Sequence, residues 1–291
     1  MTRRNRRTSS AAALTKKLPK VLGYVALSLL TAGVVAFQGC EQLPSLSSLP
    51  SMPTLQVPTS SPTQSPTGSH ATKFTECPQF FINGKPPVVP DAPKLRELCF
   101  EAFAILHSGE TRTPVFVAEK LSREAVLDAD EKRSDKFFAD ARLPRAERAE
   151  LSDYKGSGYS RGHMAPAGNM PTPAAMAQSF SLANMVPQNP KQNSGPWAKI
   201  EKDTRLYAMR AKGNVFVITG PVFDSASTTI GSNQVRVPSY LFKLVYDAET
   251  GRSWAHWQQN AESAKAGPPI SYAELAKRTG MTFLPSVNPK D

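Results

Sequence analysis

The 291-residue sequence predicts an α+β domain with a mixed, mainly antiparallel sheet, preceded by an apolar segment and a polar linker. Short β-rich runs are mixed with a few helical stretches, without the regular strand–helix alternation that favours a parallel sheet. From residue 73 to residue 291 the sequence has neither a low-complexity break nor an internal repeat, and 40% of the whole chain is apolar. One domain over residues 73–291 is therefore the simplest organisation.

Residues 1–72 predict targeting and a tether. Residues 1–20 are basic and read as a cytoplasmic N-terminus, and residues 21–37 form an uncharged run that would span roughly 26 Å as a helix. A transmembrane or signal segment is predicted here, with an inner-membrane anchor and the domain in the periplasm or outside the cell. A lipoprotein attached through Cys40 is less favoured, because Phe37 and Gln38 fit a lipobox poorly, and a cleaved soluble product ranks third. Residues 38–72 are rich in Pro, Ser and Thr and predict a disordered linker.

The charge of the chain is a weak argument for an anionic partner. The formal net charge is +11, but residues 1–20 hold seven basic residues and no acidic one. The remaining residues carry 28 basic and 24 acidic side chains, a net charge of +4. The excess positive charge therefore belongs mainly to the N-terminus.

Cysteine and histidine spacing bounds the covalent and metal chemistry. In an oxidising compartment Cys77 and Cys99 would form a disulfide, with two reduced, buried cysteines as the alternative. The sequence has no CxxC or Cys/His cluster. Its four histidines are scattered, which argues against a structural zinc site.

Secondary structure is predicted from residue pattern. Strands are expected over residues 114–118, 214–219 and 240–246, where β-branched and aromatic residues concentrate. Helices are expected over residues 122–130, 196–211 and 272–279, the last with Gly280 as its C-cap.

Two segments carry residues suited to phosphodiester cleavage. The stretch Gly158-Tyr-Ser-Arg-Gly-His-Met-Ala-Pro166 places His163 at the end of a short strand, two residues after Arg161. Asn193 follows in Gln192-Asn-Ser-Gly-Pro-Trp197, at an apparent helix entry. Histidine is a usable base near neutral pH, and an amide oxygen can hold a hard cation. Taken alone, His163 could be structural and Asn193 an N-cap.

Three further charged residues are weaker candidates. Glu201 and Arg205 lie four apart on the predicted helix, as in a surface ion pair, but they could also line a cation's water shell and approach a phosphate. Arg133 could neutralise a phosphate, although an arginine in a polar loop usually faces water.

Over nearly all of residues 73–291 the chain resembles the DNA/RNA non-specific endonucleases of the ββα-metal type. Five motifs in order carry the resemblance: Tyr159-Ser-Arg-Gly-His-Met-Ala-Pro166, Leu182-Ala-Asn-Met-Val-Pro-Gln188, Gln192-Asn-Ser-Gly-Pro-Trp-Ala198, Thr219-Gly-Pro-Val-Phe223 and Val237-Pro-Ser-Tyr-Leu-Phe-Lys243. Any one could arise by chance, but five in order are specific.

The resemblance implies a ββα-metal finger and a Mg²⁺-dependent site, with Mn²⁺ as a possible substitute. It implies that His163 is the general base, Asn193 the direct metal ligand and Glu201 a ligand through water. By the same match Arg133 and Arg205 would contact the phosphate. Asn184 is grouped with the substrate-binding residues and would support the site.

The resemblance further implies cleavage of DNA and RNA, single- or double-stranded, to 5′-phosphate ends, with a homodimer left open. One residue departs from the family: Ser160 stands where an aspartate is usual, which could lower activity. A homologue that binds nucleic acid or envelope polymer without cutting is therefore kept as the alternative. A toxin or DNA-uptake nuclease with a dedicated partner is a second one.

Overall fold

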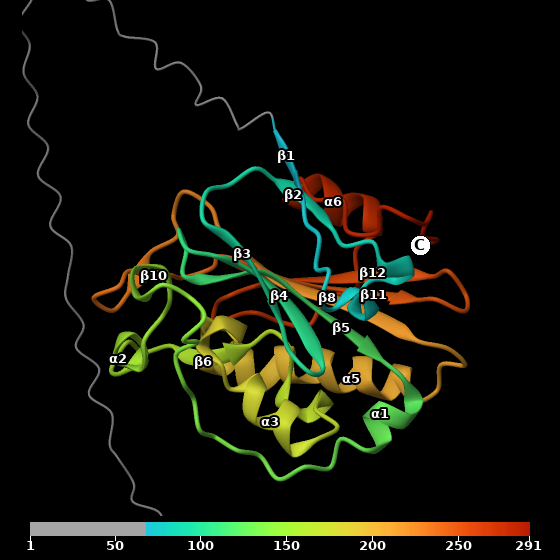
Figure 1. Cartoon of the computed structure of the whole chain (residues 1–291), viewed down its shortest axis with the longest axis horizontal. Helices are drawn as coiled ribbons and strands as arrows, with labels where there is room; N and C mark the ends of the chain where they lie inside the picture. Colours follow the sequence, from blue (N-terminus) through green and yellow to red (C-terminus); the bar gives the residue numbers. More distant parts are fainter. Residues whose placement is uncertain (1–67) are drawn as a thin grey trace, which may run out of the picture. The chain divides into compact units, whose positions relative to one another are not determined.

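A six-stranded antiparallel sheet forms the centre of the computed structural model, which describes residues 68–291 (Figure 1). Its strand order is β12-β11-β8-β5-β4-β3. The strands are β3 (Leu95–Cys99), β4 (Phe103–Ser108), β5 (Thr113–Leu121), β8 (Val215–Val222), β11 (Tyr240–Asp247) and β12 (Ser253–Gln259). Every neighbouring pair in this sheet is antiparallel, which confirms the predicted α+β class with an antiparallel sheet.

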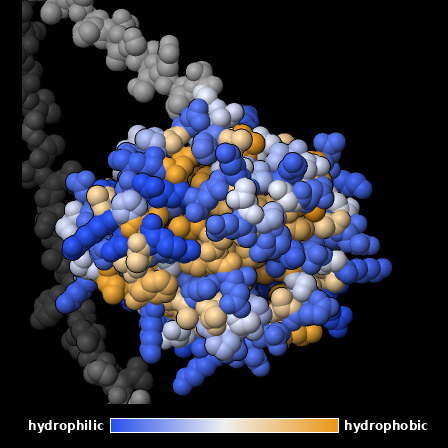
Figure 2. All heavy atoms as spheres, viewed as in Figure 1, coloured by the Kyte–Doolittle hydropathy of each residue, from blue (hydrophilic) through white to orange (hydrophobic). Residues whose placement is uncertain are grey.

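Helices cover both faces of the sheet. In Figure 1, α6 (Tyr272–Thr279) lies above the sheet, and α3 (Pro173–Ser179) and α5 (Ala198–Ala208) lie below it. The upper core includes Phe74, Phe81, Phe116, Phe242, Leu275 and Phe283. The lower core includes Val117, Met164, Met176, Trp197, Ile200 and Leu241. Burial of these apolar side chains on both faces supplies the main stabilising free energy of the domain. Figure 2 shows apolar residues in the middle of the viewed face, framed by hydrophilic ones.

A small finger carries the two chemical segments. Strands β6 (Ser160–His163) and β7 (Met185–Gln188) pair antiparallel, with His163 opposite Met185. A helical stretch follows at once, made of α4 (Pro190–Gln192), the π-helical turn η6 (Asn193–Trp197) and α5. The predicted position of His163 at the end of a short strand is confirmed.

The remaining elements are short. The two-stranded pairs are β1 (Ser69–Ala71) with β2 (Val88–Pro90), and β9 (Thr229–Ile230) with β10 (Val235–Arg236). The short helices are α1 (Arg123–Leu127) and α2 (Leu151–Tyr154), and the 3-10 turns are η1 (Pro78–Phe80), η2 (Ile82–Gly84), η3 (Arg145–Glu147), η4 (Ala167–Asn169) and η5 (Leu182–Asn184).

The predicted elements all lie inside observed ones or overlap them. Two predicted strands fall within β5 and β11, and the third, over residues 214–219, starts one residue before β8. Ser122 caps α1 by accepting from the amide of Ala125. Helix α6 matches the prediction, and Gly280 ends it at φ 69°, the left-handed conformation that glycine adopts without strain.

Residues 69–71, on the N-terminal side of the predicted boundary at residue 73, form β1 and pair with β2. Cys77 and Cys99 form the predicted disulfide, with their Cα atoms 5.8 Å apart. No helix within residues 68–291 is long and apolar enough to cross a membrane. The apolar run over residues 21–37 and Cys40 lie outside the described residues.

Candidate active site

A cavity of about 630 Å³ opens beside the finger. It is lined by Arg133, Phe137, Leu151, Tyr154, Lys155, Tyr159, Ser160, Arg161 and Asn193. Strand β6, the helical stretch after β7 and the segment before β6 therefore meet here. The cavity combines three cationic side chains with aromatic walls, a lining suited to a nucleic-acid strand.

His163 packs against two phenylalanines, one of which, Phe137, lines this cavity. Its ring centroid is 5.9 Å from that of Phe137 and 5.0 Å from that of Phe180. The side chain is 9% exposed, and its buried Nε2 has no hydrogen-bond partner among residues 68–291. Burial, together with the charge of Arg133, lowers the pKa of His163 to about 3. The imidazole is therefore neutral at pH 7 and able to accept a proton.

Arg161 and Arg133 hold their charges at the cavity through aromatic contacts. Arg161 is exposed and its guanidinium carbon lies 4.0 Å from the Phe137 ring centroid. Arg133 lies 5.0 Å from the Phe180 ring centroid and pairs with Asp135 at 2.6 Å. Residues i and i+2 of a strand point to the same side, so Arg161 and His163 share one side of β6.

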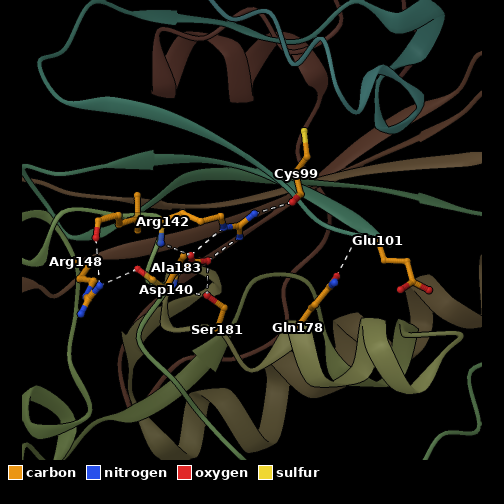
Figure 3. Close-up of polar contacts among 9 residues, drawn as sticks. Cys99, Glu101, Asp140, Arg142, Arg148, Gln178, Ser181 and Ala183 are labelled. Carbon is orange, nitrogen blue, oxygen red and sulfur yellow. Dashed lines mark hydrogen bonds and ion pairs between the residues drawn. The ribbon is translucent and has the colours of Figure 1, made fainter.

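A polar network surrounds Asp140, three residues after Phe137 (Figure 3). The Asp140 carboxylate accepts from Arg142 at 2.7 Å and from Ser181 at 3.2 Å, and Arg142 also donates to the carbonyl of Cys99. Burial alone would raise the pKa of Asp140, but its bonds to Arg142 lower it below the ordinary value. The network joins the segment that carries Phe137 to β3 and to the turn before β7.

Asn184, predicted to bind substrate, is not among the residues that line the cavity. Its side chain is fully buried. Its amide accepts from the backbone of Ala165 and donates to the carbonyls of Ala165 and Ser179, each at 2.9 Å. Both amide hydrogens and one lone pair of the amide oxygen are used in bracing the chain just after His163.

Asn193 is not the N-cap that its sequence context suggests. Asn189 caps the helical stretch by accepting from the amides of Lys191 and Gln192. Asn193 lies four residues further along, inside the π-helical turn, and its side chain lines the cavity. Pro196 lies in the same turn. Proline has no backbone N–H to donate to the preceding turn, and the wider π-helical turn accommodates the missing hydrogen bond.

Glu201 and Arg205 lie on α5 and are not among the residues that line the cavity. Arg205 donates to the side-chain oxygen of Asn169 at 3.4 Å, and its guanidinium lies over Gly168, where a Cβ would come within 3.3 Å of it. Burial raises the pKa of Glu201 against the opposing charges of Lys243 and Arg205. The two residues are therefore not an exposed ion pair; that pattern occurs instead between Lys199 and Asp203 on the solvent side of α5.

Several residues near the site were missed from the sequence. Lys155, Tyr154 and Tyr159 line the cavity, and Glu119 and Lys243 lie buried next to Glu201. Tyr159 and Lys243 stand inside two of the motifs that carry the family resemblance, which was the available signal. Glu119 and Lys155 lie outside these motifs, so no signal in the sequence pointed to them.

The donor set suits a hard cation and does not suit zinc. Residues 68–291 contain no group of three or more His, Cys, Asp or Glu side chains placed to hold a metal. One neutral amide oxygen, from Asn193, and one carboxylate further along the same helical stretch, from Glu201, match the few protein ligands that Mg²⁺ needs because it keeps most of its waters.

Comparison with known proteins gives the family. The sequence profile of the DNA/RNA non-specific endonucleases matches residues 87–290. The chain belongs to this family. Nuclease EXOG, mitochondrial, from Xenopus laevis is 34% identical over 209 residues, covering 64% of this chain and 57% of that protein. Endonuclease G, mitochondrial, from Homo sapiens is 33% identical over 207 residues, covering 64% of this chain and 69% of that protein.

The chain spans less than two thirds of the length of the EXOG relatives. A solved structure of EndoG in complex with EndoGI has the same fold, with a TM-score of 0.61 at 24% identity, covering 72% of this chain and 91% of that one.

The predicted location is wrong. The sequence predicts an inner-membrane anchor with the domain in the periplasm, whereas the EXOG and Endonuclease G relatives are mitochondrial proteins. A basic, acid-free N-terminus before an apolar run does not specify the compartment to which a protein is targeted, because basic, acid-poor leader sequences occur in proteins of more than one compartment.

Proposed function

We propose that this family member is a Mg²⁺-dependent, sugar-nonspecific endonuclease that hydrolyses DNA and RNA to 5′-phosphate ends. The observation that carries the proposal is the convergence of Arg133, Arg161 and Asn193 on one cavity, with His163 packed against Phe137 in the cavity wall. A base, cations and a metal-binding amide are the groups that phosphodiester hydrolysis requires. A lining of charge and aromatic rings without groove-reading elements fits binding to single or double strands of any sequence.

His163 is proposed as the general base. Its imidazole is neutral at physiological pH because burial and Arg133 hold its pKa low. A phosphodiester bound beside Arg133 brings negative charge, which opposes that effect and strengthens the base as the substrate arrives. The water that loses its proton to His163 then attacks phosphorus, opposite the departing 3′ oxygen.

The three arginines are proposed to bind the phosphate. Arg133 and Arg161 line the cavity directly and contact the rings of Phe180 and Phe137. Ring contacts leave guanidinium donors available, although Arg133 uses its Nε on Asp135. Arg205 is held by Asn169 from behind and would approach the phosphate from the α5 side. Arginine binds phosphate with paired donors, which favours one orientation of the scissile group.

Asn193 would hold the Mg²⁺ ion directly, and Glu201 would bind one of its water molecules; Mn²⁺ could replace it. When bound, the ion stabilises negative charge on the departing oxygen. Asn184 acts as a support for the chain after His163. A homodimer remains a prediction.

Digestion of plasmid DNA and of RNA tests the proposal. The intact protein should cut both with Mg²⁺, EDTA should stop it, and His163→Ala should lose at least about 100-fold in rate. Tyr207→Phe, on α5 but away from the cavity lining, is the matched control. Absence of metal-dependent cutting by the intact protein would overturn the proposal.

Ser160 favours one alternative, a homologue that binds nucleic acid without cutting. Its side chain lines the cavity where the family usually has an aspartate. Ser160→Asp distinguishes the two functions: a gain of cutting from an inactive parent would support the binding protein, and cutting by the parent would exclude it.

A further inference from the structure

Two buried ionisable residues lie beneath α5, outside the cavity. Glu119 on β5 and Lys243 on β11 are each 1% exposed. Thr219 on β8 pairs in register with Val117 and with Lys243, and Glu119 lies two residues beyond Val117. Since alternate strand residues share a face, Glu119 and Lys243 both point toward the face that α5 covers.

Hydrogen bonds connect this pair to the proposed site. Lys243 donates to Thr219 Oγ1 at 2.6 Å. Asn169 donates to Glu119 Oε1 at 2.9 Å and accepts from Arg205 at 3.4 Å. Asn169 therefore joins the buried carboxylate to the arginine that we assign to the phosphate.

Lys243 also lies close to the helical stretch that carries Glu201: its Nζ is 5.6 Å from the ring centroid of Trp197, four residues before Glu201. Burial lowers the pKa of Lys243, while the carboxylates of Glu119 and Glu201 act in the opposite direction. Burial raises the pKa of Glu119 to about 7, with Lys243 as the main opposing charge. Lys243 is thus a shared cation for two carboxylates, one inside the sheet and one on α5.

Stability alone does not account for such a cluster. Removing charges from water costs several kcal/mol per ion, and replacing a buried ion pair with apolar residues is often neutral or stabilising. Glu119 Oε2 also lacks a hydrogen-bond partner among residues 68–291, an additional cost. The remaining distinctive property of the cluster is its contact with Arg205 and its electrostatic coupling to Glu201.

We propose that Glu119 and Lys243 are positioning residues that hold Arg205 and Glu201 in place behind the cleavage site. Glu119 acts through Asn169 on the Arg205 guanidinium. Lys243 attracts the Glu201 carboxylate and fixes where it meets a bound cation's water. The inference rests on the proposed nuclease function.

The test compares Lys243→Met and Glu119→Gln with the wild type and with Tyr207→Phe. Tyr207 bonds Asp247 at 2.6 Å and so joins the same α5 and β11 at a different point, which makes it a control for general loosening of the helix. Two readouts are taken: the Mn²⁺ dissociation constant by electron paramagnetic resonance, and kcat and KM on a DNA duplex. Thermal unfolding is followed for every variant.

Residues that orient metal ligands typically contribute about 10- to 100-fold to affinity or activity. We expect Lys243→Met to weaken Mn²⁺ binding by about that factor, and both variants to lower kcat with KM changed less than about two-fold. Tyr207→Phe should lose stability while keeping both readouts.

The following outcomes overturn the inference. One is wild-type Mn²⁺ affinity and kcat in a folded Lys243→Met protein, which leaves the nuclease function standing. Another is an equal kcat loss in Tyr207→Phe, which indicates a general structural effect. If Lys243→Met does not fold, the test rests on Glu119→Gln, which keeps the side-chain volume, and a wild-type kcat in that variant overturns the inference. Failure of the wild type to cut with Mg²⁺ overturns the proposed function and this inference together.

Discussion

Replacing His163 with asparagine should flatten the loss of stability at mildly acidic pH. In the folded protein burial holds the pKa of His163 at about 3, against an ordinary value of 6.5. Between these values the unfolded chain binds a proton at this position and the folded chain does not. The folded state is therefore stabilised fully above pH 6.5, and that contribution is lost progressively as the pH falls toward 3.

The size of the effect follows from the distance below the ordinary pKa. A pH of 5 is about 1.5 units below the pKa of the imidazole in the unfolded chain. At about 1.4 kcal/mol per unit, protonation of the unfolded chain lowers the free energy of unfolding by about 2 kcal/mol. This value is the same for any folded-state pKa below about 4, so it does not depend on the exact depth of the shift. Asparagine keeps a polar group in place but cannot be protonated.

Urea unfolding at pH 7 and pH 5 measures the difference. The wild type should lose about 2 kcal/mol more than His163→Asn between the two pH values. The comparison cancels the contributions of His107 and His256, whose pKa values burial also lowers. Equal losses in the two proteins would refute the description of His163 as a buried, neutral imidazole.

Three further predictions concern stability and the finger. Asp140→Asn should lower the free energy of unfolding by about 2–4 kcal/mol, because it weakens a buried charged network; urea unfolding at pH 7 measures this. Double replacement of Cys77 and Cys99 by alanine opens a link between residues 22 apart and should cost about 3 kcal/mol, measured against the oxidised wild type. Gly162→Ala would put a Cβ 1.9 Å from Gln188 Oε1, so β6 must shift, and we expect a lower melting temperature and about a 100-fold slower nuclease rate. A wild-type nuclease rate in Gly162→Ala would show that the rate does not depend on the position of β6.

Local pattern predicted the elements, and long-range contacts decided what the pattern could not. The strands within β5, β8 and β11 are visible as β-rich runs, but their order in the sheet depends on pairings between distant segments. Glu119 and Lys243 would be placed on a solvent face by charge alone. They are buried because α5 covers that side of the sheet.

The site was predictable as a set of residues and less so as a geometry. His163 and Arg161 share one side of β6, as strand alternation requires. Asn189 and Asn193 both stand in a context typical of a helix start, and only the backbone shows that Asn189 is the cap. Asn184 was identified by motif, but its complete burial follows from the turn that it braces.

The π-helical turn sets the rotational phase of the helix that carries the proposed site. In a regular α-helix each residue advances about 100°, so Glu201 would be offset from Asn193 by about 80° and Arg205 by about 120°. A π turn absorbs one extra residue, which reduces both offsets to about 20° in magnitude. The widened turn thus brings an amide, a carboxylate and a guanidinium onto one line along the helix. Pro196, which cannot make the regular hydrogen bond, keeps that alignment from relaxing into an ordinary helix.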